Sequence, residues 1–315
     1  MVARIVALNS FGYPLTSLED QYQKDNKDGI QGYVSSGIWL NASYINHSCY
    51  SNVRRSFIGD MQIVRATRDI SAGEELTFWY KQPETTGYKK RQEKLQNWGF
   101  KCKCAICADD KKTLKRNLTM RDNLVGDFNA AYSAPRGPNI AKAERALTAL
   151  EETYKKPATE VPRLALEQPY LVLLKLYAAR NQAADVISSA RKFFISLGFL
   201  LTDIPVSRAP TTTCLPFHVK RWGLMVDSVL EVWLILWTAY AIVAPELVDM
   251  AEACAKTAYK ICIGEDSTFD QEVGVVAREW IGKKVCYGRV EASVDRFVWH
   301  RSKVANSGHD ADIPM

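Results

Sequence analysis

The chain has 315 residues, of which 47% are hydrophobic and 24% charged, and its formal net charge is +6. This composition is typical of a soluble globular protein of one to three domains, and a largely disordered chain is not the default expectation. The first residues hold only a short apolar run, Ile5 to Leu8, and no small-residue cleavage site follows it. We therefore read no secretory signal and expect an intracellular protein of the nucleus, the cytoplasm or both.

The positive charge is concentrated in one segment of the chain. Lys81 to Arg116 contains 11 lysines and arginines against 4 acidic residues, whereas the rest of the chain is close to neutral. Such a segment is either a contact surface for nucleic acid or an acidic peptide, or simply a solvated helix and loop, and the second interpretation is favoured.

Residues 1–80 contain short β-like runs between turn residues and no long helical periodicity. Met61 to Thr67 approximates apolar and polar alternation, Ser71 to Gly73 supplies a turn, and Leu76 to Tyr80 is aromatic enough for a returning strand. This order predicts a hairpin. Glu19 to Gly32 is a polar loop that lacks the ligand spacing of a calcium-binding loop.

Residues 81–110 form a basic, helix-like connector followed by a cluster of cysteines. Cys102, Cys104 and Cys107 lie within six residues, and without a secretory signal this spacing indicates a metal site rather than disulfides. Structural zinc is held by four ligands, and Cys49 is the expected fourth. A distant ligand of this kind would clamp the strand region onto the connector and contribute folding free energy.

Beyond about residue 117 the pattern changes to amphipathic segments rich in Ala, Leu and Lys. Helices are predicted for residues 140–154, 163–179, 183–197, 220–242 and 245–263. Short connectors suggest antiparallel pairs, either in a repeat array or in a plain helical bundle, and residues 163–197 have the size of one tetratricopeptide unit.

Leu224 to Val243 is the most apolar segment of the chain. Asp227 and Glu231 lie inside it, and it barely reaches the length of a membrane span. A buried helix is therefore expected, and no membrane association.

Four short patterns in the first 110 residues carry chemistry: Asn46-His47-Ser48-Cys49 followed by Asn52, Gly73 to Tyr80, Trp98-Gly99-Phe100, and the cysteine cluster. Taken one at a time they are weak. A lone histidine is more often structural than catalytic, and isolated tyrosine, tryptophan or phenylalanine side chains usually belong to a core.

Their order, however, resembles the C-terminal SET core and post-SET segment, most closely the SET and MYND subfamily and its fungal relatives with helical repeats. The resemblance covers about residues 4–110. It implies an α+β fold: a small β-rich, partial SET domain at 1–80, a zinc-bound post-SET segment at 81–110, and an all-α helical domain at 111–315, TPR-like or bundled.

The resemblance also implies a function and a set of site residues. Members of the family transfer a methyl group from S-adenosylmethionine to a lysine of a protein or peptide substrate. Asn46 and His47 match the pair that holds the cofactor, on a segment that threads beneath the Tyr80 loop, and Phe100 matches an aromatic residue that packs on its adenine ring. Tyr80 matches the tyrosine whose hydroxyl lines the methyl-transfer channel, and Ser43 matches a residue whose carbonyl helps line it. The zinc would be structural.

The sequence departs from the family pattern before Asn9. SET domains begin with a strand bearing a Gly-x-Gly motif, and no such motif precedes Asn9, so we expect the chain to begin inside the domain. Two hypotheses follow. The chain is part of a protein-lysine methyltransferase, or it is a non-catalytic interaction module in which zinc and the strands support the helices.

Overall fold

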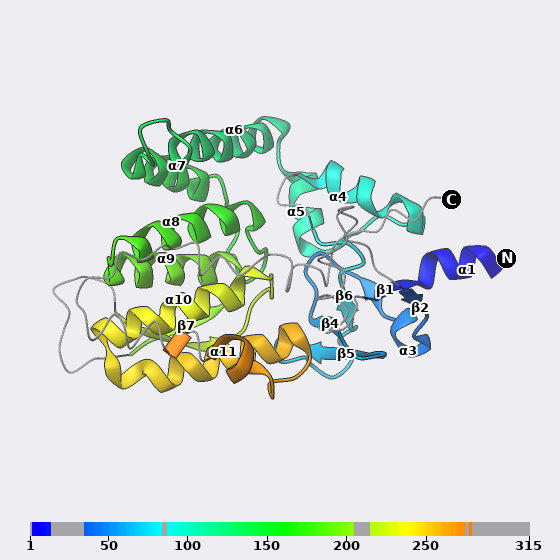
Figure 1. Ribbon diagram of the computed structural model, residues 1–315. Helices are drawn as coiled ribbons and strands as arrows, with labels where there is room; N and C mark the ends of the chain where they lie inside the picture. The colour runs from blue at the N-terminus through cyan, green and yellow to red at the C-terminus, as the bar shows by residue number, and fades with distance from the viewer. Residues whose placement is uncertain (1, 14–34, 84–86, 205–214, 275–276, 279–315) are drawn as a thin grey trace.

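The computed structural model describes residues 2–13, 35–83, 87–204, 215–274 and 277–278. In this part of the chain a small region with short strands lies beside a larger stack of helices (Figure 1). The fold class expected from the sequence, α+β with a helical C-terminal part, is confirmed. The polar loop at 19–32 lies outside the described residues.

The strand-containing region is made of short elements: α1 (Val2–Asn9), β1 (Phe11–Tyr13), β2 (Ser35–Gly37), α3 (Leu40–Ser43), β3 (Asn46–His47), β4 (Val53–Ile58), β5 (Met61–Ala66) and β6 (Thr77–Phe78). Four two-stranded sheets are found among the described residues, three of them here. β1 pairs with β2 and β4 with β5 in antiparallel fashion, whereas β3 and β6 are parallel. The helix α1 was not expected from the sequence.

The predicted hairpin between Met61–Thr67 and Leu76–Tyr80 is wrong. β5 pairs with the preceding strand β4 instead, through a tight turn in which Gly59 has φ +58°, a conformation that glycine adopts without strain. The second segment is held elsewhere, because the Asn52 side chain accepts a hydrogen bond from the Thr77 amide at 2.8 Å and places β6 beside β3.

The basic connector contains α4 (Tyr88–Leu95), the 3₁₀ turn η1 (Gln96–Trp98) and α5 (Ala105–Lys112). The cysteine cluster lies at the start of α5, since Cys104 occupies its N-cap position. The connector therefore places three cysteines between the strand-containing region and the first long helix.

The helical region consists of α6 (Lys115–Tyr132), α7 (Ile140–Glu152), η2 (Leu164–Leu166), α8 (Glu167–Ala179), α9 (Ala183–Ser196), α10 (Ser228–Val243), η3 (Pro245–Leu247), α11 (Val248–Ile263) and the π-helical turn η4 (Asp270–Gly274). Each long helix packs chiefly on its neighbours in the chain, so that α6 with α7, α8 with α9 and α10 with α11 form successive layers (Figure 1). A two-stranded sheet, β7 (Leu200–Asp203) with β8 (Phe217–Arg221), interrupts the helices.

The helix predicted for 220–242 begins later than expected, at Ser228. Lys220 and Arg221 belong to β8, and the amide of Leu224 donates to the Leu197 carbonyl at 2.9 Å, so the backbone before α10 is bonded to other elements. The expectation of a buried helix is confirmed, because α10 is enclosed along most of its length. Within the described residues, no helix has the length and apolarity to cross a membrane.

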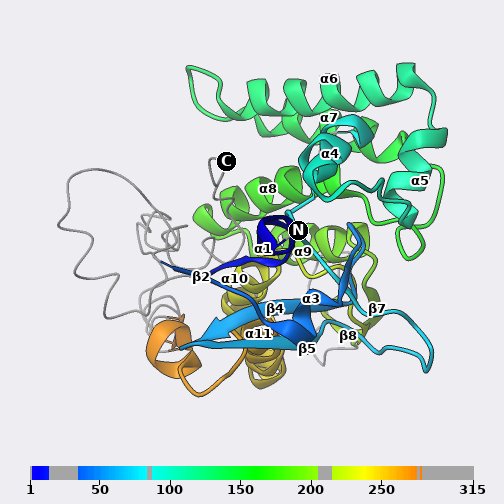
Figure 2. The same cartoon turned by 90° about the vertical axis from the view of Figure 1, so that its right-hand side faces the viewer.

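The two regions are joined through the β4–β5 hairpin, which lies against α11 (Figure 2). Arg54 forms a partly buried ion pair with Asp227 and donates to the Met225 carbonyl at 3.2 Å. Arg65 donates to the Gly264 carbonyl at 2.7 Å. Gly264 has φ +101°, and a Cβ there would lie 2.5 Å from the hydroxyl of a β4 serine, so glycine permits the close approach.

Candidate functional site

Four cysteine sulfurs converge where the connector meets the strand-containing region. The sulfurs of Cys49, Cys102, Cys104 and Cys107 all lie within 4.8 Å of one another. The sulfur of Cys49 is 3.9 Å from that of Cys102 and 3.6 Å from that of Cys107. Tetrahedral zinc with Zn–S bonds of about 2.3 Å requires sulfurs roughly 3.8 Å apart, so the arrangement fits this ion.

The cluster is largely buried, and Cys104 is its one partly exposed member. Cys49 and Cys107 are 1% and 0% exposed. Gln92 of α4 orients two ligands, because its carbonyl oxygen accepts from the Cys102 amide at 2.9 Å and its amide donates to the Cys107 sulfur at 3.5 Å. Four thiolates leave no open coordination position, so a metal held here would be structural rather than catalytic.

The backbone next to the cluster runs alongside the segment that ends at Tyr80, because β3 and β6 pair in parallel. The Ser48 amide donates to the Phe78 carbonyl at 3.3 Å, and the Tyr80 amide donates to Nδ1 of His47 at 3.0 Å. The Tyr80 hydroxyl donates to the Ile45 carbonyl at 3.1 Å. Tyr80 is thereby anchored, through its backbone amide and its hydroxyl, to residues 45–47 just before the first cysteine.

Aromatic rings surround Tyr80. The ring centroids of His47, Phe78, Trp98 and Phe100 lie between 5.4 and 6.0 Å from that of Tyr80. Burial raises the pKa of the Tyr80 hydroxyl, so this group is a neutral hydrogen-bond donor over the physiological pH range. The result is a largely apolar wall with one directed hydroxyl.

The structure brings together four of the five predicted cofactor and catalytic residues. Asn46 is exposed and donates to the Glu75 carboxylate at 2.7 Å, His47 is buried beside Tyr80, and Phe100 is half-buried with its ring 6.0 Å from that of His47. Ser43 is the last residue of α3, and its hydroxyl donates to the carbonyl of Trp39.

The sequence reasoning missed Arg55. Its Nη1 donates to the Trp79 carbonyl at 2.6 Å, and its guanidinium lies 4.9 Å from the Phe78 ring centroid and 5.2 Å from that of Phe11. The signal available was the Arg54–Arg55 pair inside an alternating strand, which sends two cations to opposite faces.

A small cavity adjoins Tyr80 at the boundary of the two regions. Tyr80, Gln82 and Arg55 line it from the strand-containing region, and Met225 and Asp227 line it from the segment before and at the start of α10. The cavity therefore combines aromatic, cationic and anionic groups, Tyr80 among them.

The basic segment 81–116 is largely a solvent-exposed surface. Lys89, Lys90, Lys101 and Lys103 are all exposed. Arg91 is different, because it is 2% exposed and forms a buried ion pair with Asp110. Part of the charge excess therefore stabilises the connector rather than facing a partner.

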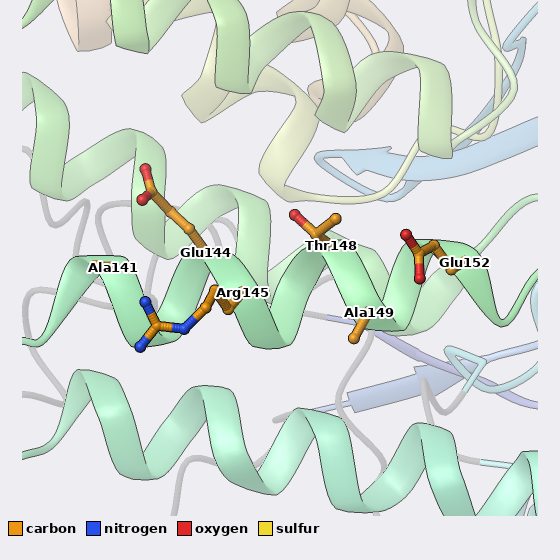
Figure 3. Close-up of a pocket in the computed structure, with 6 residues that line it drawn as sticks. All are labelled: Ala141, Glu144, Arg145, Thr148, Ala149 and Glu152. Carbon is orange, nitrogen blue, oxygen red and sulfur yellow. The ribbon is translucent and has the colours of Figure 1, made fainter.

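A second hollow lies on the exposed side of α7 and is shown in Figure 3. The side chains of Glu144 and Arg145 leave the helix in different directions (Figure 3). Glu144 is engaged by the hydroxyl of Tyr177 from α8. The polar atoms that line the hollow do not converge on a common point, so the hollow lacks the geometry of a binding centre.

Comparison with known proteins gives the class. A family model described as SET domain matches residues 9–81. Residues 9–81 therefore match the SET domain, and the chain resembles the SMYD and fungal SET proteins.

Three relatives illustrate the similarity. A protein named Methyltransferase from Gibberella zeae is 38% identical over 279 residues, which cover 86% of this chain and 38% of that protein. Histone-lysine N-methyltransferase SET5 of Yarrowia lipolytica is 35% identical over 124 residues, 38% of this chain and 28% of the relative. Histone-lysine N-methyltransferase SMYD3 of Homo sapiens is 35% identical over 94 residues, 30% of this chain and 20% of the relative. The matched segments thus span well under half the length of these relatives.

Proposed function

We propose that this chain forms part of a SET-type methyltransferase that uses S-adenosylmethionine to methylate lysine side chains of proteins. The observation that carries the proposal is the anchoring of Tyr80, whose hydroxyl lies 3.1 Å from the Ile45 carbonyl beneath an aromatic wall. The names of the relatives support it, since they are a methyltransferase and histone-lysine methyltransferases.

The cofactor supplies an already activated methyl group on a sulfonium, so the protein has to align the acceptor and exclude water. The half-buried ring of Phe100 suits stacking on an adenine, and the exposed side chain of Asn46 suits a polar contact. The main chain of Asn46 and His47 completes this wall, and the carbonyl of Ser43 is assigned to the lining of the transfer channel.

Tyr80 acts on the acceptor amine. Its neutral hydroxyl, whose proton is donated to the Ile45 carbonyl, accepts from an amine N–H and so orients an uncharged lysine. The rings of Phe78, Trp98 and Phe100 disfavour the charged ammonium by limiting its hydration. The cavity bounded by Gln82 and the α10 end is the proposed approach for the peptide, so that the helical region forms one of its walls.

Structural zinc at Cys49, Cys102, Cys104 and Cys107 is the second part of the proposal. The ion would join the SET segment (1–80) to the post-SET segment (81–110) and keep Phe100 beside Tyr80. A location in the nucleus or cytoplasm is part of the proposal, because relatives of this chain are named histone-lysine methyltransferases.

Calorimetry with S-adenosylmethionine on the folded, zinc-loaded chain tests the proposal, followed by transfer of labelled methyl groups to core histones. We expect saturable binding, and a loss of transfer of about 100-fold or more in Tyr80→Phe, because one directed hydroxyl is removed. Tyr88→Phe on α4 serves as the matched control and retains transfer.

Absence of cofactor binding by folded, zinc-loaded chain would overturn the enzymatic proposal. It would support the alternative, in which the zinc-stabilised strands and helices form a non-catalytic interaction module.

A further inference from the structure

The imidazole of His47 lies between the cysteine cluster and Tyr80. Its Nε2 is 3.4 Å from the sulfur of Cys49, and its Nδ1 is 3.0 Å from the amide nitrogen of Tyr80. The residue as a whole is 9% exposed. Both nitrogens therefore have protein partners, one on each side of the ring.

These contacts determine the tautomer. A backbone amide can only donate, so Nδ1 must carry a lone pair toward Tyr80, and the ring proton of neutral His47 must then sit on Nε2. Nε2–H points at the sulfur of Cys49, which is a thiolate acceptor when it holds a metal. Hydrogen bonds of this kind orient metal ligands from outside the coordination sphere.

The same peptide group is held from its other side. The Trp79 carbonyl, which belongs to the peptide bond that carries the Tyr80 amide, accepts from Arg55 at 2.6 Å. The indole of Trp79 donates to the Cys49 carbonyl at 3.2 Å. Both polar atoms of the Trp79–Tyr80 peptide are thus fixed, and two contacts lead back to one cysteine.

We infer that His47 is a positioning residue that couples the cysteine-bound metal to Tyr80, by donating from Nε2 to Cys49 and accepting the Tyr80 amide at Nδ1. Metal binding fixes the orientation of the imidazole, and the imidazole fixes the position of the Tyr80 backbone amide. The position of the backbone in turn determines where the tyrosine hydroxyl lies. The His47 side chain has no free nitrogen for a cofactor, so any cofactor contact of this residue is made by its main chain.

The consequence for catalysis rests on the proposed function, whereas the coupling itself does not. Two substitutions separate the two arms of the ring. In His47→Asn the amide oxygen replaces Nδ1 and keeps the Tyr80 contact. In His47→Gln the terminal amide replaces Nε2 and keeps the Cys49 contact. His218→Gln on β8 is the control.

The rate of zinc release to a chelator reports on the first contact, between Nε2 of His47 and the Cys49 sulfur. We expect release to be about 10-fold faster in His47→Asn, in line with losses of outer-shell partners, and close to the unmodified rate in His47→Gln and His218→Gln. Equal release rates in both His47 variants would overturn the coupling.

The NMR signal of the Tyr80 backbone amide reports on the second contact, between that amide and Nδ1 of His47. In protein labelled with ¹⁵N-tyrosine, the Tyr80 resonance is the one missing from Tyr80→Phe. We expect it to shift in His47→Gln and to keep its position in His47→Asn. The reverse pattern would contradict the assignment of Nδ1 as acceptor.

A third measurement uses the unmodified chain, in case a variant fails to fold. The chain has only 4 histidines, so ¹⁵N-histidine labelling resolves their rings. We expect one neutral imidazole protonated at Nε2 in the zinc-loaded protein, and a ring protonated at Nδ1 at this site would overturn the inference. None of these readouts requires cofactor binding, so failure of the proposed function leaves them decisive.

Discussion

The strand-containing region and the helical region are stabilised in different ways. The first has a separate core of four buried residues, Phe11, Ala42, Val53 and Phe78, and strands of two to six residues. The second is organised around α10, whose tryptophans Trp233 and Trp237 are both fully buried. A region with so little apolar burial depends on polar contacts and metal ligands, whereas the helices depend on packing.

Polar networks replace apolar area in the strand-containing region. Asn52 bonds the Thr77 amide and the Glu75 carbonyl, and it also donates to the Glu74 carboxylate. Hydrogen bonds from the side chains of Arg68, which has the larger effect, and of Asn52 lower the pKa of Glu74 to about 2. Such networks define geometry sharply but contribute modest net stability, because water competes for exposed members.

Removing a metal ligand is expected to have the largest effect on this contrast. In Cys49→Ser and Cys104→Ser, zinc content should fall well below one ion per chain. The strand-containing region should lose stability, because a metal-binding free energy on the order of 10 kcal/mol no longer contributes to its folding. Metal analysis combined with thermal unfolding measures both quantities. Cys254→Ser, on α11 and away from the cluster, is the control, and unchanged zinc content in Cys49→Ser would exclude Cys49 as a ligand.

Truncation of a buried tryptophan in the helical region is expected to have the next largest effect. Trp233→Ala should lower the free energy of unfolding by about 3–5 kcal/mol, because it leaves a cavity among Phe194, Phe217 and Trp222, while zinc content stays unchanged. Denaturant unfolding measures the loss. Ile242→Ala, at a position 45% exposed, should stay within about 0.5 kcal/mol, and equal losses at both positions would contradict the packing argument.

The contact between the regions gives the smallest expected effect. Asp227→Asn weakens its pair with Arg54, whose side chain is only 10% exposed, and should cost about 2 kcal/mol. Glu93→Gln breaks the exposed pair with Lys89 and should cost less than about 0.5 kcal/mol. Equal unfolding free energies of the two variants would show that the boundary is not held by this ion pair.

The candidate metal site was predictable from the sequence. Cys102, Cys104 and Cys107 lie close together in the chain, so their proximity in space follows from covalent geometry, and the number of ligands that zinc requires pointed to Cys49. The convergence of the four sulfurs agrees with that prediction. The roles of Asn46, the Ser43 carbonyl and Phe100 remain predictions.

Strand pairing was less predictable. Residues 61–67 and 76–80 have alternation that suits a hairpin, but alternation does not identify a partner, and the Gly59 turn and the Asn52 side chain decided the pairing. The predicted start of α10 was wrong for a similar reason. Residues 220–227 are apolar enough for a helix, but backbone groups among them bond to other elements.

The sequence by itself determined which residue types meet at the site and in what order along the chain, since motif spacing and cysteine count are properties of the covalent structure. Only the tertiary structure decided what each atom of those residues does. The two nitrogens of His47 are chemically similar in the sequence, and they differ here because Cys49 lies on one side of the ring and the Tyr80 amide on the other. Contacts between segments 33 residues apart depend on the packing of the whole region, which no local pattern specifies.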